Sequence, residues 1–150
     1  MFRHILFPTD GSALSRRAAK VAVQMARKHN ARLTAFHVIP PYVPAVFPDA
    51  TMYVPVDLIS PEMYAKETAR EAAKILGVVA TLARAAGVKV RTATASSSRP
   101  WEAVVKAAKK NKCDLLVMAS HGRKGVEGLI LGSETTKVLT HSKIPVLVCR

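Results

Sequence analysis

The stretch "CDLLVMASHGRKGVEGLILGSETTKVLTHS", residues 113–142, decides the fold of this chain. It begins with the continuous apolar run 113–120, passes through a glycine-rich loop and ends with a helix-like pattern over 133–142. A short apolar run without alternation is typical of a strand that is buried on both faces of a parallel sheet. The stretch therefore predicts one strand-loop-helix unit of an α/β protein.

The same alternation of strands and helices continues on the N-terminal side. Apolar or β-rich runs predict further strands at 3–8, 32–39, 88–95 and 144–150. Amphipathic periodicity predicts further helices at 12–30, 61–87 and 99–112. This order favours an open five-stranded parallel sheet with helices on both faces, a Rossmann-like architecture with the common strand order 3-2-1-4-5.

Local signals mark some of the expected helix ends. Ser12 is expected to be the N-cap of the first helix, and Asn30 is expected to stop it. The third helix opens with Pro100, and either Ser97 or Ser98 is expected to cap it. These signals set the expected helix boundaries.

Residues from about 40 to 60 depart from the regular pattern. The range 40–61 contains six prolines and many apolar side chains with little periodicity. Because the regular pattern resumes directly afterwards, this segment is expected to be an excursion within a single domain, 1–150. Its apolar content suggests that it covers something, as a lid or as a dimer contact.

Composition and charge limit the classes of function. The chain is 49% hydrophobic and has a formal net charge of +13, so it is expected to form a core and to favour anionic partners. No apolar run approaches the roughly 18 residues of a membrane span. Cys113 and Cys149 lack a CxxC spacing and are expected to be buried reduced thiols, which predicts a cytoplasmic protein.

Two strand ends are expected to form the ligand site. In the order 3-2-1-4-5 the strand order reverses between the first and fourth strands, whose ends are "PTDGS", 8–12, and "MASHG", 118–122. Gly122 permits a backbone that turns its N–H groups toward an anion, and a helix that opens at Gly132 and Ser133 suits phosphate. Spacing alone equally allows a simple βα connection in which Ser133 is an ordinary cap.

Asp10 and the histidines have alternative interpretations. Asp10 either bonds a ribose hydroxyl, or assists a divalent ion held by phosphates, or forms an Asx turn in "PTDGS". His37, near the end of the second strand, is expected to be a partly buried histidine with a satisfied ring. His121 lies near the glycine loop, where it is a candidate phosphate contact.

Sequence motifs of catalysis are missing from the chain. The chain has no GxxxxGK[ST] loop, no GxGxxG after the first strand and no GxSxG nucleophile. Neither zinc-ligand spacing nor a pair of carboxylates stands out. A nucleotide-binding regulator is therefore expected rather than an enzyme, with slow ATP hydrolysis as the most that the residues suggest.

Four segments together resemble the universal stress protein family. They are "ILFPTDGS" at 5–12, "HVI" at 37–39, "VMASHGRKGVEGLILGS" at 117–133 and "IPVLVCR" at 144–150. The resemblance covers essentially the whole chain in the same order and spacing. It implies an open five-stranded fold of the adenine nucleotide alpha hydrolase-like type and a homodimer that is paired through the last strand.

ATP-binding members of that family carry the pattern G-x2-G-x9-G-[ST]. On this chain the pattern falls on Ala119, Gly122, Gly132 and Ser133, so alanine replaces the first glycine. The resemblance implies ATP as the ligand, with Mg²⁺ or Mn²⁺ held by its phosphates near Asp10.

The resemblance also assigns the remaining contacts to the nucleotide. Pro8, Thr9 and Asp10 would lie against the ribose and adenine. Val38 would offer backbone bonds to the adenine edge, and Met118 would line the pocket. Glu134 and Thr135 would follow Ser133 near the terminal phosphates, where the Glu134 carboxylate would compete with phosphate if it pointed inward.

Two other functions compete with nucleotide binding. The chain would be a ligand-free interaction dimer if Ala119 and Glu134 closed the pocket. It would be a nucleic-acid- or polyanion-binding protein if its basic clusters formed a binding surface. Those clusters are Arg16, Arg17 and Lys20, together with Lys106, Lys109, Lys110 and Lys112. Most of these residues are expected on solvated helix faces, and only 5% of the chain is aromatic, which argues against nucleic acid.

Overall fold

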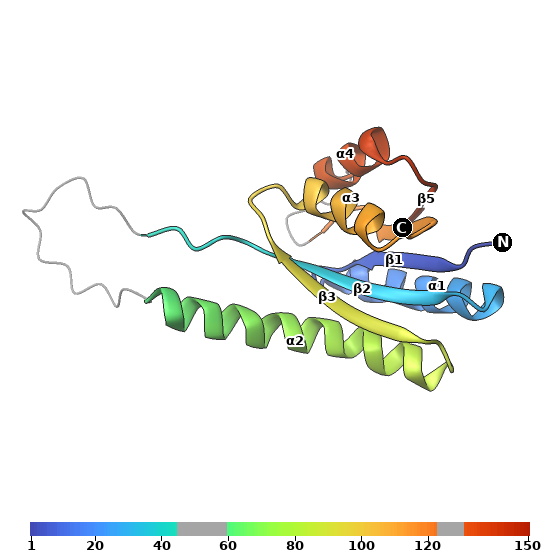
Figure 1. Ribbon diagram of the computed structural model, residues 1–150, viewed down its shortest axis with the longest axis horizontal. Helices are drawn as coiled ribbons and strands as arrows, with labels where there is room; N and C mark the ends of the chain where they lie inside the picture. The colour runs from blue at the N-terminus through green and yellow to red at the C-terminus, as the bar shows by residue number, and fades with distance from the viewer. Residues whose placement is uncertain (45–59, 123–130) are drawn as a thin grey trace, which may run out of the picture.

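The computed structural model describes residues 1–44, 60–122 and 131–150, and in these ranges strands and helices alternate as expected (Figure 1). The elements are β1 (His4–Pro8), α1 (Ala13–His29), β2 (Arg32–Ile39), α2 (Pro61–Ala85), β3 (Val90–Ser96), α3 (Pro100–Lys110), β4 (Leu115–Ala119), α4 (Ser133–His141) and β5 (Val146–Cys149).

The five strands form one parallel sheet in the order β3-β2-β1-β4-β5, which confirms the predicted topology. All of β1 pairs with β2, from His4 to Pro8. With β4, by contrast, β1 shares only the pairs Ile5–Leu115 and Leu6–Leu116. The two central strands therefore pair near their amino ends and stop pairing toward their carboxyl ends, at the place where the strand order reverses.

Helices cover both faces of the sheet, as predicted. Because side chains alternate along a strand, Ile5 and Phe7 enter the core beneath α1 and α2, whereas Leu6 enters the core beneath α3 and α4. Each of these three side chains is fully buried, which stabilises the fold by about 1.5–3 kcal/mol per side chain. Figure 1 shows α2 on one side of the sheet and α3 with α4 on the other.

The ends of α1 match the predicted signals, and the end of α2 explains where β3 begins. Ser12 caps α1 by accepting the Ser15 N–H at 3.1 Å, and Asn30 adopts a left-handed φ of 52°, so both predicted signals are confirmed. After α2, the Val88 N–H donates to the Ala83 carbonyl at 2.9 Å in a Schellman-type turn. Because the Val88 N–H is hydrogen-bonded within this turn, it does not join the sheet, and β3 begins at Val90 instead of at the predicted residue 88.

The predicted cap of α3 is wrong. Arg99 is the N-cap residue of α3, and its side chain makes no capping bond. The Ser97 hydroxyl accepts the Arg99 N–H at 3.0 Å, so this serine shapes the turn before the helix instead of capping it. A residue from another helix supplies the missing acceptor, as described below.

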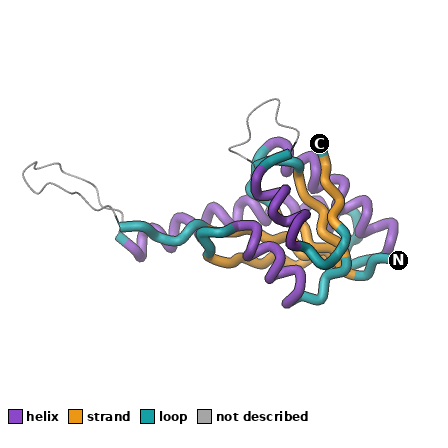
Figure 2. The backbone as a smooth tube through the Cα atoms, turned by 90° about the horizontal axis from the view of Figure 1, so that it is seen from above, coloured by secondary structure: helices purple, strands orange, loops and turns teal. Residues whose placement is uncertain are grey.

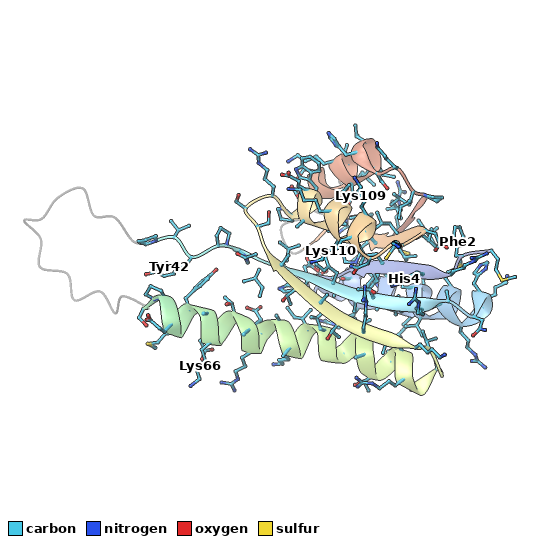
Figure 3. The ribbon with its side chains drawn as sticks, in the orientation of Figure 1. Phe2, His4, Tyr42, Lys66, Lys109 and Lys110 are labelled. Carbon is cyan, nitrogen blue, oxygen red and sulfur yellow. The ribbon has the colours of Figure 1, made fainter. Side chains whose placement is uncertain are left out.

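Residues 40–44 and the N-terminal half of α2 extend side by side away from the sheet (Figure 2). The Tyr64 hydroxyl donates to the Pro40 carbonyl at 2.7 Å, and the rings of Tyr42 and Tyr64 lie 5.4 Å apart. Tyr42 is labelled in Figure 3. The greater part of the predicted excursion, residues 45–59, lies outside the described residues.

The two cysteines differ in their surroundings. Neither is in a disulfide; Cys113 is buried, as predicted, whereas Cys149 is only half-buried. Burial raises the pKa of the Cys113 thiol to about 11, so this side chain is an uncharged thiol at neutral pH. Among the helices of the described residues, none combines the length and the apolar character needed to cross a bilayer.

Candidate functional site

The turn between β1 and α1 is held by its own hydrogen bonds. Asp10 Oδ1 accepts the Ser12 N–H at 3.0 Å, which is the Asx turn that the sequence allowed. The hydroxyls of Thr9 and Ser15 are hydrogen-bonded at 2.8 Å, and Gly11 has a φ of 76°. The Asx turn occupies Oδ1, and the structure brings the other oxygen, Oδ2, to the loop that follows β4.

Gly122 lies directly against Asp10. A Cβ atom placed on Gly122 would be 2.5 Å from Asp10 Oδ2, closer than real Cβ contacts allow. The glycine is therefore required by a neighbour that is distant in the sequence. The ends of β1 and β4 meet at this contact, just beyond the point where the two strands stop pairing.

The start of α4 is fixed to the same end of the sheet. The Gly132 N–H donates to the Ser120 carbonyl at 2.8 Å, and the Thr135 hydroxyl donates to the Ala119 carbonyl at 3.1 Å. A Cβ on Gly132 would lie 3.1 Å from both Cα and Cβ of His121. These contacts bring the first turn of α4 against the end of β4, although residues 123–130 of the glycine-rich loop lie outside the described residues.

The first turn of α4 has no side-chain cap within the part of the chain that the structure describes. Its N-cap is Gly132, which has no side chain to accept a hydrogen bond. The Glu134 carboxylate instead accepts the Trp101 N–H at the start of α3 through Oε2, at 2.8 Å. The N-terminal N–H groups of α4, which carry the positive end of the helix dipole, are therefore not capped by this acid.

Two histidines lie near these strand ends. Nδ1 of His37 donates to the Thr9 carbonyl at 2.8 Å, which satisfies the ring as predicted and joins the ends of β1 and β2. His121 Nδ1 lies 3.2 Å from the hydroxyl of Ser120, a buried residue. The histidines therefore help to hold the backbone around the opening between β1 and β4.

Comparison with known proteins identifies the family. All 150 residues match the sequence model of the Universal stress protein family. The chain belongs to this family. Universal stress proteins of known sequence include one from Thermus aquaticus, 34% identical over 150 residues that cover 100% of both chains. Another, MJ0531 of Methanocaldococcus jannaschii, is 33% identical over 156 residues and is covered to 83% of its length by the whole of this chain.

A solved structure has the same fold. The crystal structure of a universal stress protein in complex with cAMP superimposes with a TM-score of 0.71 at 27% identity. The alignment covers 99% of this chain and 97% of that one. That relative binds an adenine nucleotide, and the resemblance inferred from the sequence is confirmed at the level of the family and the fold.

Ala119, where ATP-binding universal stress proteins have glycine, packs away from α4. Its methyl group belongs to the core cluster beneath α1 and α2, whereas α4 covers the opposite face. Met118, the preceding residue, enters the α3 and α4 core, and the half-buried Val38 packs against that same core. The alanine therefore adds its volume to a core, away from the face on which α4 starts.

Two sequence expectations concern charge. Within residues 1–44, 60–122 and 131–150, no three or more Asp, Glu, His or Cys side chains are grouped so that they could hold a metal ion by themselves. Asp10 therefore belongs to no such group. All seven members of the basic clusters are exposed, as expected of solvated helix faces. Lys109 and Lys110 of α3 are labelled in Figure 3.

Sequence reasoning did not find the bond between Glu134 and Trp101. It assigned Glu134 to the surroundings of the terminal phosphates and expected Ser97 or Ser98 to cap α3. Trp101 does contact α4, with its ring 4.4 Å from that of His141. No local signal pointed to a partner in another helix, because Ser97 and Ser98 offered plausible local caps in the sequence.

Proposed function

We propose that this universal stress protein is a regulatory protein that binds an adenine nucleotide, with ATP as the preferred ligand, between the ends of β1 and β4. The observation that carries the proposal is the contact of Gly122 with Asp10 beside the first turn of α4, which no side chain of the described residues caps. The contact brings the loops after β1 and β4 together beside a helix N-terminus, which favours phosphate.

The phosphates would bind at the start of α4. Gly132 and the exposed Ser133 would present backbone N–H groups and a hydroxyl to them, and Thr135 holds this turn on the Ala119 carbonyl. The backbone of Gly122, which follows β4, would approach the phosphates from the side opposite the start of α4. Mg²⁺ or Mn²⁺ carried by the phosphates would neutralise part of their charge near Asp10, since ATP usually binds together with such a cation.

The nucleoside would bind toward β1 and β2. Asp10 would accept a hydrogen bond from a ribose hydroxyl, and the backbone of Val38 would bond the adenine edge. Pro8, Thr9 and Met118 would line this part of the pocket. Their partial or full burial suits an apolar base, which gains affinity by leaving water.

The proposed role is regulation through binding and not turnover. The sequence carries no GxSxG nucleophile motif. We further propose that the whole chain is one domain, that it forms a homodimer through β5 and that it acts in the cytoplasm. The two free cysteines and the exposed sheet edge at β5 support these proposals.

The direct test is mass spectrometry of the ligand released when freshly purified protein is denatured, followed by ATP titration of variants. Asp10→Asn keeps the oxygen that accepts the Ser12 N–H in the Asx turn but loses the charge, and it should weaken ATP binding about tenfold. Asp114→Asn is the matched control, because the Asp114 carboxylate also accepts backbone N–H bonds, from Arg3 and His4, near the amino end of the sheet. Equal ATP affinities of both variants and the wild type would refute the assigned site.

Gly132→Val, the obvious variant for crowding the phosphates, is a poor test here. Its Cβ would first meet His121 and the Ser120 carbonyl, at 3.1 and 3.2 Å, so the turn itself would shift. Retention of nucleic acid at low salt with no bound nucleotide would favour the polyanion-binding alternative, since such binding depends steeply on salt. A dimer that binds neither would favour the ligand-free interaction module.

A further inference from the structure

The Glu134 carboxylate joins the starts of two helices. Glu134 is in the first turn of α4, and its Oε2 accepts the backbone N–H of Trp101, in the first turn of α3, at 2.8 Å. The N-cap of α3, Arg99, makes no side-chain capping bond. Glu134 therefore supplies to α3, from another helix, the acceptor that a local cap normally provides.

The contacts of the Glu134 carboxylate fix where its negative charge lies. A carboxylate in a first turn is attracted by the N-terminus of its own helix, where it would compete with a bound phosphate. Here Oε2 is bonded to α3, and Oε1 lies 3.3 Å from Nζ of Lys137. Each carboxylate oxygen thus has a partner away from the N–H groups at the start of α4.

Trp101 contacts α4 near both of its ends. Its backbone N–H donates to Glu134 in the first turn, and its ring lies against that of His141 in the last turn, with centroids 4.4 Å apart and the planes tilted by 36°. Val138, between them, is buried in the core that α3 and α4 share. A shift of the first turn of α4 would therefore change the surroundings of the Trp101 indole.

We propose that Glu134 is a positioning residue that ties the phosphate-facing end of α4 to the start of α3, so that nucleotide occupancy is transmitted to Trp101. The inference rests on the proposed function, because it concerns the same nucleotide site. Glu134 acts through the placement of α4, keeps its own charge off the phosphates and couples the site to the α3–α4 surface.

The test compares three variants by calorimetric titration with ATP and with adenosine, and by fluorescence of Trp101, the single tryptophan of the chain. Glu134→Gln keeps the oxygen that accepts the Trp101 N–H and should bind ATP within about twofold of the wild type. Glu134→Ala removes the acceptor and should bind ATP about tenfold more weakly, as expected when a site must be ordered on binding. Adenosine, which lacks phosphates, should bind all variants equally.

Glu102→Gln is the matched control. Glu102 is also an acid in a first turn, that of α3, but among the described residues its ion pairs are with Arg99 and Lys106 on the surface, at 3.6 and 2.9 Å. Its variant should match the wild type in every measurement. The fluorescence change caused by ATP should persist in Glu134→Gln and in the control, and should be lost in Glu134→Ala.

The outcomes separate this inference from the proposed function. If the wild type binds ATP and Glu134→Ala keeps both the affinity and the fluorescence change, the inference is overturned while the nucleotide site stands. A roughly tenfold tighter binding of ATP by Glu134→Gln also overturns it, because the carboxylate would then face the phosphates. Binding of neither ATP nor adenosine by the wild type overturns the proposed function, and this inference with it.

Discussion

Gly122 and Asp10 touch across the opening between the two central strands, and a Cβ on the glycine would lie 2.5 Å from Asp10 Oδ2. Asp10 follows β1, and Gly122 follows β4. Their contact shows that the two loops which end these strands form one surface. The glycine is needed because of what faces it, since its Cβ position is filled by a carboxylate oxygen.

Gly122→Ala should therefore displace Asp10 and loosen the Asx turn that precedes α1. We expect a loss of about 1 kcal/mol in the free energy of unfolding, measured with urea, and weaker ATP binding. The double variant Asp10→Ala with Gly122→Ala should lose less stability than the two single variants added together, because the clash requires both side chains. Strict additivity would contradict the contact.

Two serines at helix starts should respond in opposite ways. Ser12 caps α1 with its hydroxyl, so Ser12→Ala should lower the free energy of unfolding by about 1 kcal/mol. Ser133 is exposed in the first turn of α4, where it does not serve as the N-cap. Ser133→Ala should leave the urea midpoint nearly unchanged and should weaken ATP binding, as measured by calorimetry. A large loss of stability in Ser133→Ala would contradict this assignment.

His4 should make the fold sensitive to mild acid. The ring is buried in the middle of the sheet, where Nε2 lies 2.7 Å from the Thr34 hydroxyl, which also accepts a hydrogen bond from Nε of Arg91. Nδ1 has no hydrogen-bond partner among the described residues. Burial, and then the charges of Arg32 and Arg91, lower the pKa of His4 below its usual value, although the backbone of Asn111 and the Asp114 carboxylate oppose this.

The sign of the effect follows from proton binding. In the unfolded chain, His4 binds a proton below about pH 6.5. In the folded protein, the lowered pKa delays this protonation to a lower pH. The free energy of unfolding therefore falls as the pH falls from about 6.5 toward the folded-state pKa. Thermal unfolding between pH 7.5 and 5 should show a declining Tm. His4→Gln, which carries no titratable ring, should show a flatter profile, and an equally steep one would exclude His4 as the cause.

The dimer interface can be tested at the outer edge of β5. Residues 145 and 149 accept N–H bonds from β4, so the backbone of the intervening Val148 points to the free edge. Val148→Pro removes an outward N–H without breaking the β4–β5 ladder. We expect the wild type to sediment as a dimer and this variant as a monomer. A monomeric wild type, or a variant that remains dimeric, would exclude pairing through this edge.

Most of the fold could be predicted from the sequence because its signals are local. The apolar runs of β1 and β4 and the periodicity of α1 and α2 depend on neighbouring residues, and hydrophobic burial favours a single layered arrangement of such elements. Predicted and observed elements agree in type and order and differ at their ends. Those ends depend on turns that compete with the strands for backbone N–H groups. The turn after α2, for example, binds the Val88 N–H, which the sequence had placed in a strand.

The arrangement of the candidate site could likewise be predicted only in part from the sequence. The sequence by itself determined that a glycine-rich loop, an aspartate and a serine-led helix follow the first and fourth strands, and thereby the family. Only the tertiary structure decided that Gly122 faces Asp10, that the methyl group of Ala119 enters a core and that Glu134 bonds to Trp101. The physical reason is that each of these relationships depends on groups that are distant in the chain and that the packed sheet and helices bring together.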